Sequence, residues 1–204
     1  MHNQYEPQSL AGGFTSLFLW YNGFSRKCKK EVFFMLDNKV KELLNTQINK
    51  ELYSAYLYLQ FANYYEDEGL SGFSNWYTVQ AQEERDHAML MLKYMQMHGE
   101  SVTLEAIDKP DAVLSSNIDP LKAGLKHEQY VTGLINTIYG AAYDAKDFGT
   151  MQFLDWFVKE QVEEENNAST LIKKMEMFGT DAKGLYMLDQ ELAARVYAAP
   201  SLVL

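Results

Sequence analysis

The sequence predicts an all-α protein: a bundle of four long helices with a short fifth helix. Apolar residues recur at three- and four-residue steps through four long stretches, a period that only a helix turns to one side. No strand-like alternation and no internal repeat stands out. Residues 100–119 have little periodicity, and in a helical bundle such a connection often carries the chain from one end to the other between two neighbouring parallel helices.

The first helix is expected from Asp37 onward, because Asp37 can cap its start and Gly69 follows its end. Its apolar stripe consists of Val40, Leu43, Leu44, Ile48, Leu52, Ala55, Leu59 and Ala62. The second helix is expected to open at Ser71, acting as its N-cap, and to stop at Gly99. The long connection then separates it from the third helix.

The third helix is expected over residues 120–145, with Pro120 in its first turn. Residues 146–149 form a short turn before the fourth helix, which is expected over residues 150–178, its apolar stripe including Val158 and Val162. Gly179 ends that helix. A short fifth helix is expected over residues 184–196.

Composition excludes several classes of function. The chain has 204 residues, a net charge of −10 and a pI near 4.9, which argues against a nucleic-acid partner because phosphate binding needs clustered Lys and Arg. Cys28 is the only cysteine, so neither an internal disulfide nor an all-cysteine metal site can form. No apolar run approaches the roughly 20 residues that span a bilayer. We expect a cytoplasmic protein with no membrane partner.

The first 34 residues differ from the rest of the chain. They carry four basic residues against two acidic ones, and the basic residues follow the apolar stretch, whereas a secretory signal would place them before it. We expect residues 1–34 to be a poorly ordered extension, or a start codon assigned too early with Met35 as the true first residue. A docking or sorting segment is the alternative. Residues 35–204 form the functional domain.

The informative residues are glutamates at positions where an apolar stripe should continue. Glu51 lies on the first helix, Glu84 and His87 one turn apart on the second, and Glu128 on the third. The fourth helix repeats the three-residue spacing with a glutamine and a glutamate. This pair is Gln161 and Glu164.

Buried carboxylates need cations. An ionised carboxylate inside a protein costs several kcal/mol unless it is paired or bound to metal. Two divalent ions would offer four positive charges against the four glutamates, with His87 as a neutral ligand. Oxygen-rich ligands with one imidazole suit iron(II), manganese or zinc.

Each position also has an ordinary explanation. A single glutamate on a helix is usually solvated, and a single histidine is usually hydrogen-bonded in a structural role, as we expect for His98 and His127. The combination carries the prediction, because one Glu, E-x-x-H, one Glu and Q-x-x-E on four successive helices form an ordered set. Di-iron bundles use single glutamates on two helices and E-x-x-H on two others, so the fourth helix departs from that scheme.

With these residues in place, the chain resembles the non-haem ferritins of bacteria and archaea from about Met35 to Arg195. The stretches that carry the resemblance are KELYSAYLYLQFA, QAQEERDHAM, LKHEQYV and FLDWFVKEQVEEE, at residues 50–62, 80–89, 125–131 and 153–165. The resemblance implies a ferritin-like four-helix bundle with the long crossover between the second and third helices. It also implies that Glu51, Glu84 and His87 hold one iron. The second iron is then held by Glu84, Glu128 and Glu164, with Gln161 nearby.

The resemblance implies further roles around this centre. Glu83, Glu160 and Glu163, together with Glu164, match a third iron site found in several members of the family, although a solvated acidic face would explain them too. Tyr58, two helical turns after Glu51, matches a tyrosine that hydrogen-bonds a ligand or donates an electron. Trp156 matches another aromatic near the site, which core packing explains equally well.

The function implied by the resemblance is iron storage and detoxification. A ferroxidase centre would oxidise Fe(II) with dioxygen or peroxide, and ferric oxyhydroxide mineral would collect inside a hollow homo-oligomeric shell of 24 subunits.

Three relatives and one unrelated class compete with this reading. Bacterioferritins bind haem through a methionine directly after the bridging glutamate, where this chain has Arg85, so we expect no haem. Rubrerythrin-type peroxidases usually add a four-cysteine iron domain, which Cys28 alone cannot supply. Small DNA-protecting relatives place their iron ligands between subunits. A catalytically silent shell or interaction protein is the alternative from another class.

Overall fold

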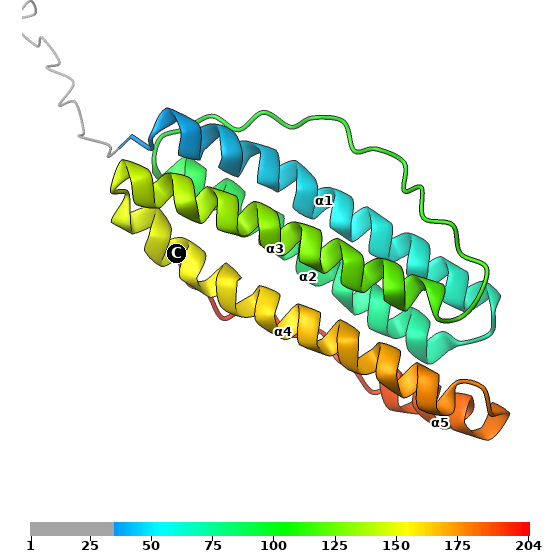
Figure 1. Ribbon diagram of the computed structural model, residues 1–204. Helices are drawn as coiled ribbons and strands as arrows, with labels where there is room; N and C mark the ends of the chain where they lie inside the picture. The colour runs from blue at the N-terminus through cyan, green and yellow to red at the C-terminus, as the bar shows by residue number, and fades with distance from the viewer. Residues whose placement is uncertain (1–34) are drawn as a thin grey trace, which may run out of the picture. The chain divides into compact units, whose positions relative to one another are not determined.

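The computed structural model describes residues 35–204 as five helices, and that part of the chain contains no strand (Figure 1). The helices are α1 (Asn38–Asp67), α2 (Ser71–Met97), α3 (Asp119–Ala145), α4 (Phe148–Phe178) and α5 (Ala182–Ala193). The predicted four-helix bundle with a short fifth helix is confirmed. The predicted extension, residues 1–34, lies outside the described residues. No helix of residues 35–204 is long and apolar enough to cross a membrane.

The four long helices pack in antiparallel pairs. α1 packs against α2 and α3, and α3 packs against α4, while α5 lies on α2 and α4. α2 and α3 run in the same direction, and the connection of residues 98–118 passes along the outside of the bundle between them (Figure 1). The predicted crossover is therefore confirmed. The two parallel helices contact each other through side chains, as where the Tyr77 hydroxyl on α2 donates to the carbonyl of Pro120 on α3 at 3.2 Å.

Polar side chains of α1 hydrogen-bond to the main chain of the crossover, residues 98–118. Asn45 exchanges two hydrogen bonds with the main chain of Thr103, at 2.8 and 3.0 Å. Asn49 donates to the carbonyls of residues 105 and 106, and the Tyr65 hydroxyl donates to the carbonyl of Asn117 at 2.6 Å. These contacts satisfy backbone groups that a strand or helix would otherwise pair, so a connection without regular structure still follows one path.

The start of α2 differs from the prediction. Ser71 is the first helical residue rather than the N-cap, and Leu70 at the N-cap makes no side-chain hydrogen bond. The free N–H groups of Gly72 and Phe73 instead donate to Oδ1 of Asp189 on α5, at 2.7 and 3.1 Å. A carboxylate at a helix N-terminus is also favoured by the helix dipole, so a distant residue replaces the local cap.

Local caps set the other helix starts. Asp37 caps α1 as predicted, accepting from the N–H groups of Lys39 and Val40. Asp147 accepts from the N–H of Thr150 at 3.0 Å, so α4 begins two residues earlier than predicted. Asp181 accepts from Gly184 at 2.8 Å, which moves α5 from the predicted 184–196 to Ala182–Ala193.

The apolar core has two parts, with a polar layer between them. One part gathers around Leu44, Met91 and Phe157, and the other around Phe61 and Phe73. The buried glutamates lie on the same inward faces as these residues. The bundle therefore holds its charged residues at mid-length, with apolar packing on both sides.

In the first and fourth helices, two residues of the predicted apolar stripes face outward, which contradicts the prediction. Leu59 is 48% exposed and Val162 is 69% exposed. Each follows a buried residue, Tyr58 and Gln161 respectively, and one residue turns the helix surface by 100°. The inward positions belong to the polar site residues, so their apolar neighbours face outward.

Candidate metal centre

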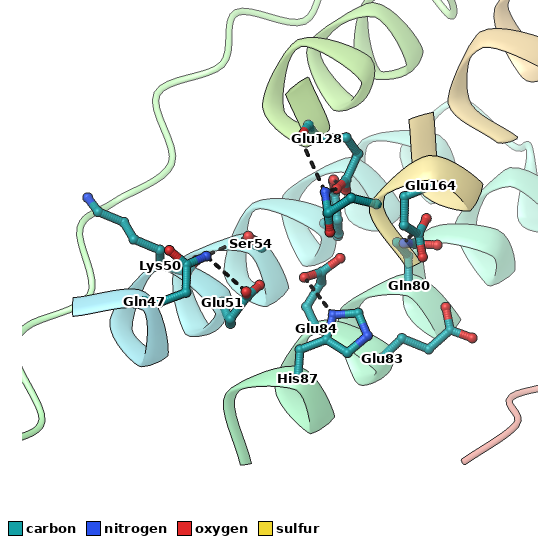
Figure 2. Close-up of polar contacts among 12 residues, drawn as sticks. Gln47, Lys50, Glu51, Ser54, Gln80, Glu83, Glu84, His87, Glu128 and Glu164 are labelled. Atoms are coloured by element: carbon teal, nitrogen blue, oxygen red, sulfur yellow. Dashed lines mark hydrogen bonds and ion pairs between the residues drawn. The ribbon is translucent and has the colours of Figure 1, made fainter. Parts of the chain in front are cut away.

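Each long helix contributes a buried acidic side chain to the middle of the bundle. Glu51 comes from α1, Glu84 and His87 from α2, Glu128 from α3 and Glu164 from α4, and none is more than 9% exposed. Figure 2 shows Glu84 in the centre, with the other side chains around it. The five residues predicted as ligands therefore lie together in the interior of the bundle.

Three of these residues form a compact ligand group. Glu51, Glu84 and His87 each offer one ligand atom, and these atoms all lie within 4.8 Å of one another. Nδ1 of His87 is 3.6 Å from Oε2 of Glu84. Oε2 of Glu51 and Oε1 of Glu84 are buried and accept no hydrogen bond from residues 35–204. Since a buried polar oxygen without a partner is costly, these atoms fit a metal ion.

The other two carboxylates have hydrogen-bond donors. The Tyr58 hydroxyl donates to Oε1 of Glu128, and the Gln161 amide donates to its Oε2 at 3.1 Å. The Gln80 amide donates to Oε2 of Glu164 at 2.7 Å. Glu128 and Glu164 are thus oriented by neighbouring side chains, beside the compact group rather than within it.

The cluster favours protonated carboxyls when no cation is bound. Burial raises the pKa of Glu51 and Glu84 well above the usual range, and neighbouring carboxylates raise both further. Burial and the charge of Glu128 raise the pKa of Glu164 to about 8. Because bound metal requires deprotonated ligands, a divalent cation would replace these protons.

The sequence matches the ferritin-like domain family over residues 41–178, which include every residue of this cluster. The chain belongs to the ferritin-like family. It is 37% identical over 163 residues to the bacterial non-heme ferritin of Staphylococcus haemolyticus, covering 80% of this chain and 98% of that protein. It is 34% identical over 158 residues to a probable bacterial non-heme ferritin-like protein of Haemophilus influenzae, covering 78% and 96%.

Solved structures agree with the sequence matches. The open-pore ferritin of the archaeon Archaeoglobus fulgidus superposes with a TM-score of 0.77 at 43% identity, covering 79% of this chain and 99% of that one. An engineered closed form of the same ferritin gives a TM-score of 0.78 at 43% identity, covering 80% and 99%. The predicted resemblance to the non-haem ferritins is confirmed. Family membership and the ligand group support iron storage as the function.

Two site residues of this ferritin were missed by the sequence reasoning. Gln47 is buried and donates to Oε1 of Glu51 at 2.9 Å, and Gln80 is buried and supports Glu164. Each glutamine lies four residues before a predicted ligand, Gln47 before Glu51 and Gln80 before Glu84. A polar residue one turn from a buried glutamate, on the same inward face, was the available signal.

The outer acidic residues of this ferritin are not part of the compact group. Glu83 pairs with Arg195 at 2.5 Å, and its carboxylate is directed away from Glu84 (Figure 2). Glu160 is half-buried and Glu163 is exposed. Of the predicted third-site residues, only Glu164 is buried with the other candidate ligands.

Aromatic and histidine neighbours complete the description. Tyr58 is buried on the α1 face that carries Glu51, as predicted. Trp156 packs edge-on against the His87 ring, with centroids 5.4 Å apart. His98 and His127 are hydrogen-bonded as expected, to the Tyr94 carbonyl at 2.9 Å and to the Ser54 hydroxyl at 2.7 Å.

Proposed function

We propose that this ferritin oxidises Fe(II) at a dinuclear centre before storing the iron. The ligands would be Glu51, Glu84, His87, Glu128 and Glu164. The observation that carries the proposal is the pair of buried carboxyl oxygens, on Glu51 and Glu84, that accept no hydrogen bond within residues 35–204. They belong to the one group of His, Cys, Asp and Glu side chains in the described residues whose ligand atoms converge.

The charges support two divalent ions. Glu51, Glu84 and His87 would hold the first ion, and Glu84, Glu128 and Glu164 the second. Glu84 would bridge them, because its two oxygens lie between the two groups of side chains (Figure 2). Four carboxylates balance two Fe(II), whereas two Fe(III) exceed that charge. The excess positive charge of the ferric product would favour oxide or hydroxide as its further ligands, and with them its eventual exit.

The reaction requires two electrons, one from each Fe(II). Each of two Fe(II) gives one electron to dioxygen, which becomes peroxide, or to peroxide, which becomes water. Hydrolysis of the Fe(III) then yields oxyhydroxide and releases protons. Tyr58 touches the Glu128 carboxylate, so it is placed to adjust this ligand or to supply an electron during the step.

Gln161 would be a neighbour of the second ion rather than a strong ligand. Its amide nitrogen is committed to the carbonyl and Oε2 of Glu128, at 3.3 and 3.1 Å. A third iron on Glu83, Glu160, Glu163 and Glu164 would bind more weakly than the pair. Glu83 already has a cationic partner in Arg195.

The assembly is proposed from the relatives. A single bundle has no storage cavity, so mineral storage would need a homo-oligomeric shell, and the resemblance supports 24 subunits in the cytoplasm. Haem is not proposed, since the exposed Arg85 stands where bacterioferritins carry a methionine.

The test is an anaerobic Fe(II) titration of the assembled protein, followed by oxygen and by sizing of the assembly. We expect two tightly bound Fe(II) per subunit, rapid oxidation and a shell. Glu128→Ala should slow oxidation strongly, while Glu176→Ala, which removes an exposed charge on the same bundle, should not. If Glu128→Ala oxidised iron at the unmodified rate, the assigned centre would be wrong. A sample that takes up no iron would indicate a silent shell.

A further inference from the structure

The chain continues past α5 as a segment that returns along the bundle. Residues 194–204 run back from α5 behind α4, and the C-terminus is marked near the start of α4 (Figure 1). The Tyr197 hydroxyl donates to Asp86 on α2, and the Trp156 indole N–H on α4 donates to the Ser201 hydroxyl at 3.0 Å. We call residues 194–204 the C-terminal strap. It lies against both helices that carry the ligands Glu84 and Glu164.

Arg195 is the charged residue of this strap that points into the bundle. Its guanidinium donates to Oε1 of Gln80 at 2.7 Å and to Oε2 of Glu83 at 2.5 Å. It also lies over the Trp76 ring, 4.0 Å from the centroid. The Arg195 and Glu83 side chains are only 17% and 19% exposed. A planar group that donates in two directions matches this arrangement, whereas a lysine would keep the positive charge but not both hydrogen bonds.

Gln80 links Arg195 to the metal centre. Because its Oε1 accepts from Arg195, its Nε2 must face the other way, and there it donates to Glu164 at 2.7 Å. The hydrogen bonds therefore run from Glu83 through Arg195 and Gln80 to Glu164. Trp76 and Gln80 also line a small cavity that reaches Tyr58, Glu128 and Glu164, so Arg195 contacts two residues of its wall.

We propose that Arg195 is a positioning residue that keeps the centre dinuclear. It holds Gln80 against Glu164, which keeps that carboxylate available to the second ion. It also engages Glu83, so a third cation would have to displace a guanidinium from its ligand. The proposal rests on the proposed function and predicts that a third ion binds weakly.

The binding experiment uses zinc(II), which suits the same ligands and is not oxidised. Calorimetric titration of the assembled wild-type protein should give two tight ions per subunit and a weak third. Arg195→Gln should tighten the third ion at least about tenfold, because removing a cation a few ångströms from the site lowers repulsion. Arg195→Lys keeps the charge and should leave the third ion weak.

Two further variants separate charge from anchoring. Arg195→Gln combined with Glu83→Gln should return the third ion to weak binding, which would show that Glu83 is the released ligand. Tyr197→Phe loosens the strap but keeps the guanidinium, and should behave like wild type. Circular dichroism and assembly size confirm that each variant folds.

The outcomes are distinguishable. Two outcomes would overturn the role of Arg195 and leave the dinuclear centre standing. In one, a third ion binds wild-type protein as tightly as the first two. In the other, Arg195→Gln binds the third ion no more tightly than wild type does. The role of Arg195 would also be overturned if Arg195→Lys or Tyr197→Phe bound the third ion as tightly as Arg195→Gln does. Attachment of the strap, and not the charge of Arg195, would then decide how many ions bind. A wild type with no tight zinc would refute the dinuclear centre, and the role of Arg195 with it.

Discussion

The Tyr58 hydroxyl donates a hydrogen bond to the Glu128 carboxylate inside the bundle, joining α1 to α3. Tyr58→Phe removes that donor and leaves a buried carboxyl oxygen unpaired. We expect the free energy of unfolding of the metal-free protein to fall by about 1 to 3 kcal/mol. Fe(II) oxidation should slow, while two ions still bind. Chemical denaturation and stopped-flow oxidation measure these effects. Tyr56→Phe, at a tyrosine 50% exposed on the same helix, is the control. Unchanged oxidation would remove Tyr58 from the mechanism.

Metal-free protein should lose stability as pH rises. The pKa of Glu164 is raised to about 8 in the folded protein, against about 4.3 in an unfolded chain. Between these values the folded state holds a proton that the unfolded chain has released, so stability falls by up to about 1.4 kcal/mol per pH unit for this group. Burial shifts the pKa of Glu51, Glu84 and Glu128 in the same direction.

Thermal unfolding of metal-free protein across that pH range measures the effect. Zinc should stabilise the protein most at the alkaline end of the range, where the buried carboxyl groups have lost their protons. Glu164→Gln should make the pH dependence shallower. A melting temperature that stayed level or rose with pH would contradict the raised pKa values.

Gly72→Ala should destabilise the protein, although alanine is favoured over glycine by about 1 kcal/mol inside a helix. A Cβ at Gly72 would lie 1.8 Å from the carbonyl oxygen of Asp189, so α5 must move and its cap on α2 is lost. We expect a cost of about 1 to 3 kcal/mol. Faster hydrogen exchange in α5 would accompany it.

Gly133→Ala on α3 is the matched control for that substitution. Nothing lies within 4 Å of a Cβ at that position, so the intrinsic helix preference should appear and the protein should be slightly stabilised. If both alanines stabilised the fold, the close approach of α5 to α2 would be wrong.

Asn45→Ala should loosen the crossover without unfolding the bundle. Asn45 makes both of its hydrogen bonds to the main chain of Thr103, each worth about 0.5 to 1.5 kcal/mol. Hydrogen exchange should quicken around residue 103 and stay unchanged in α1. Asn63→Ala is the control, because within residues 35–204 the Asn63 amide donates to Asp67 on its own helix and not to the crossover. Equal exchange in the two variants would show that the crossover is held by other contacts.

Periodicity was sufficient to predict the long helices and the buried position of the candidate ligands. Glu51, Glu84, Glu128 and Glu164 interrupt apolar stripes, and an inward carboxylate has few stable alternatives to a cation. Spacing also placed Tyr58 on the face of Glu51. Periodicity was less reliable at Leu59 and Val162. Where the inward positions are occupied by polar residues, an assignment made from apolar residues alone selects neighbours that face outward.

The accuracy of the predicted helix ends depended on whether the capping residue is close in the sequence. Asp37 caps α1 from the adjacent sequence, and that start was predicted correctly. α2 is capped by Asp189, 117 residues away from Gly72, and no local pattern contains that information.

The sequence by itself determined which residues face the interior, since helical period and charge are local properties. Only the tertiary structure decided their partners: Gln80 against Glu164, and Arg195 on both Gln80 and Glu83. These contacts join α2 to α4 and to the C-terminal strap, and their geometry follows from how separate helices pack. A carboxylate at an inward position therefore predicts a candidate metal site from the sequence. The side chains that orient it are identified only from the tertiary structure.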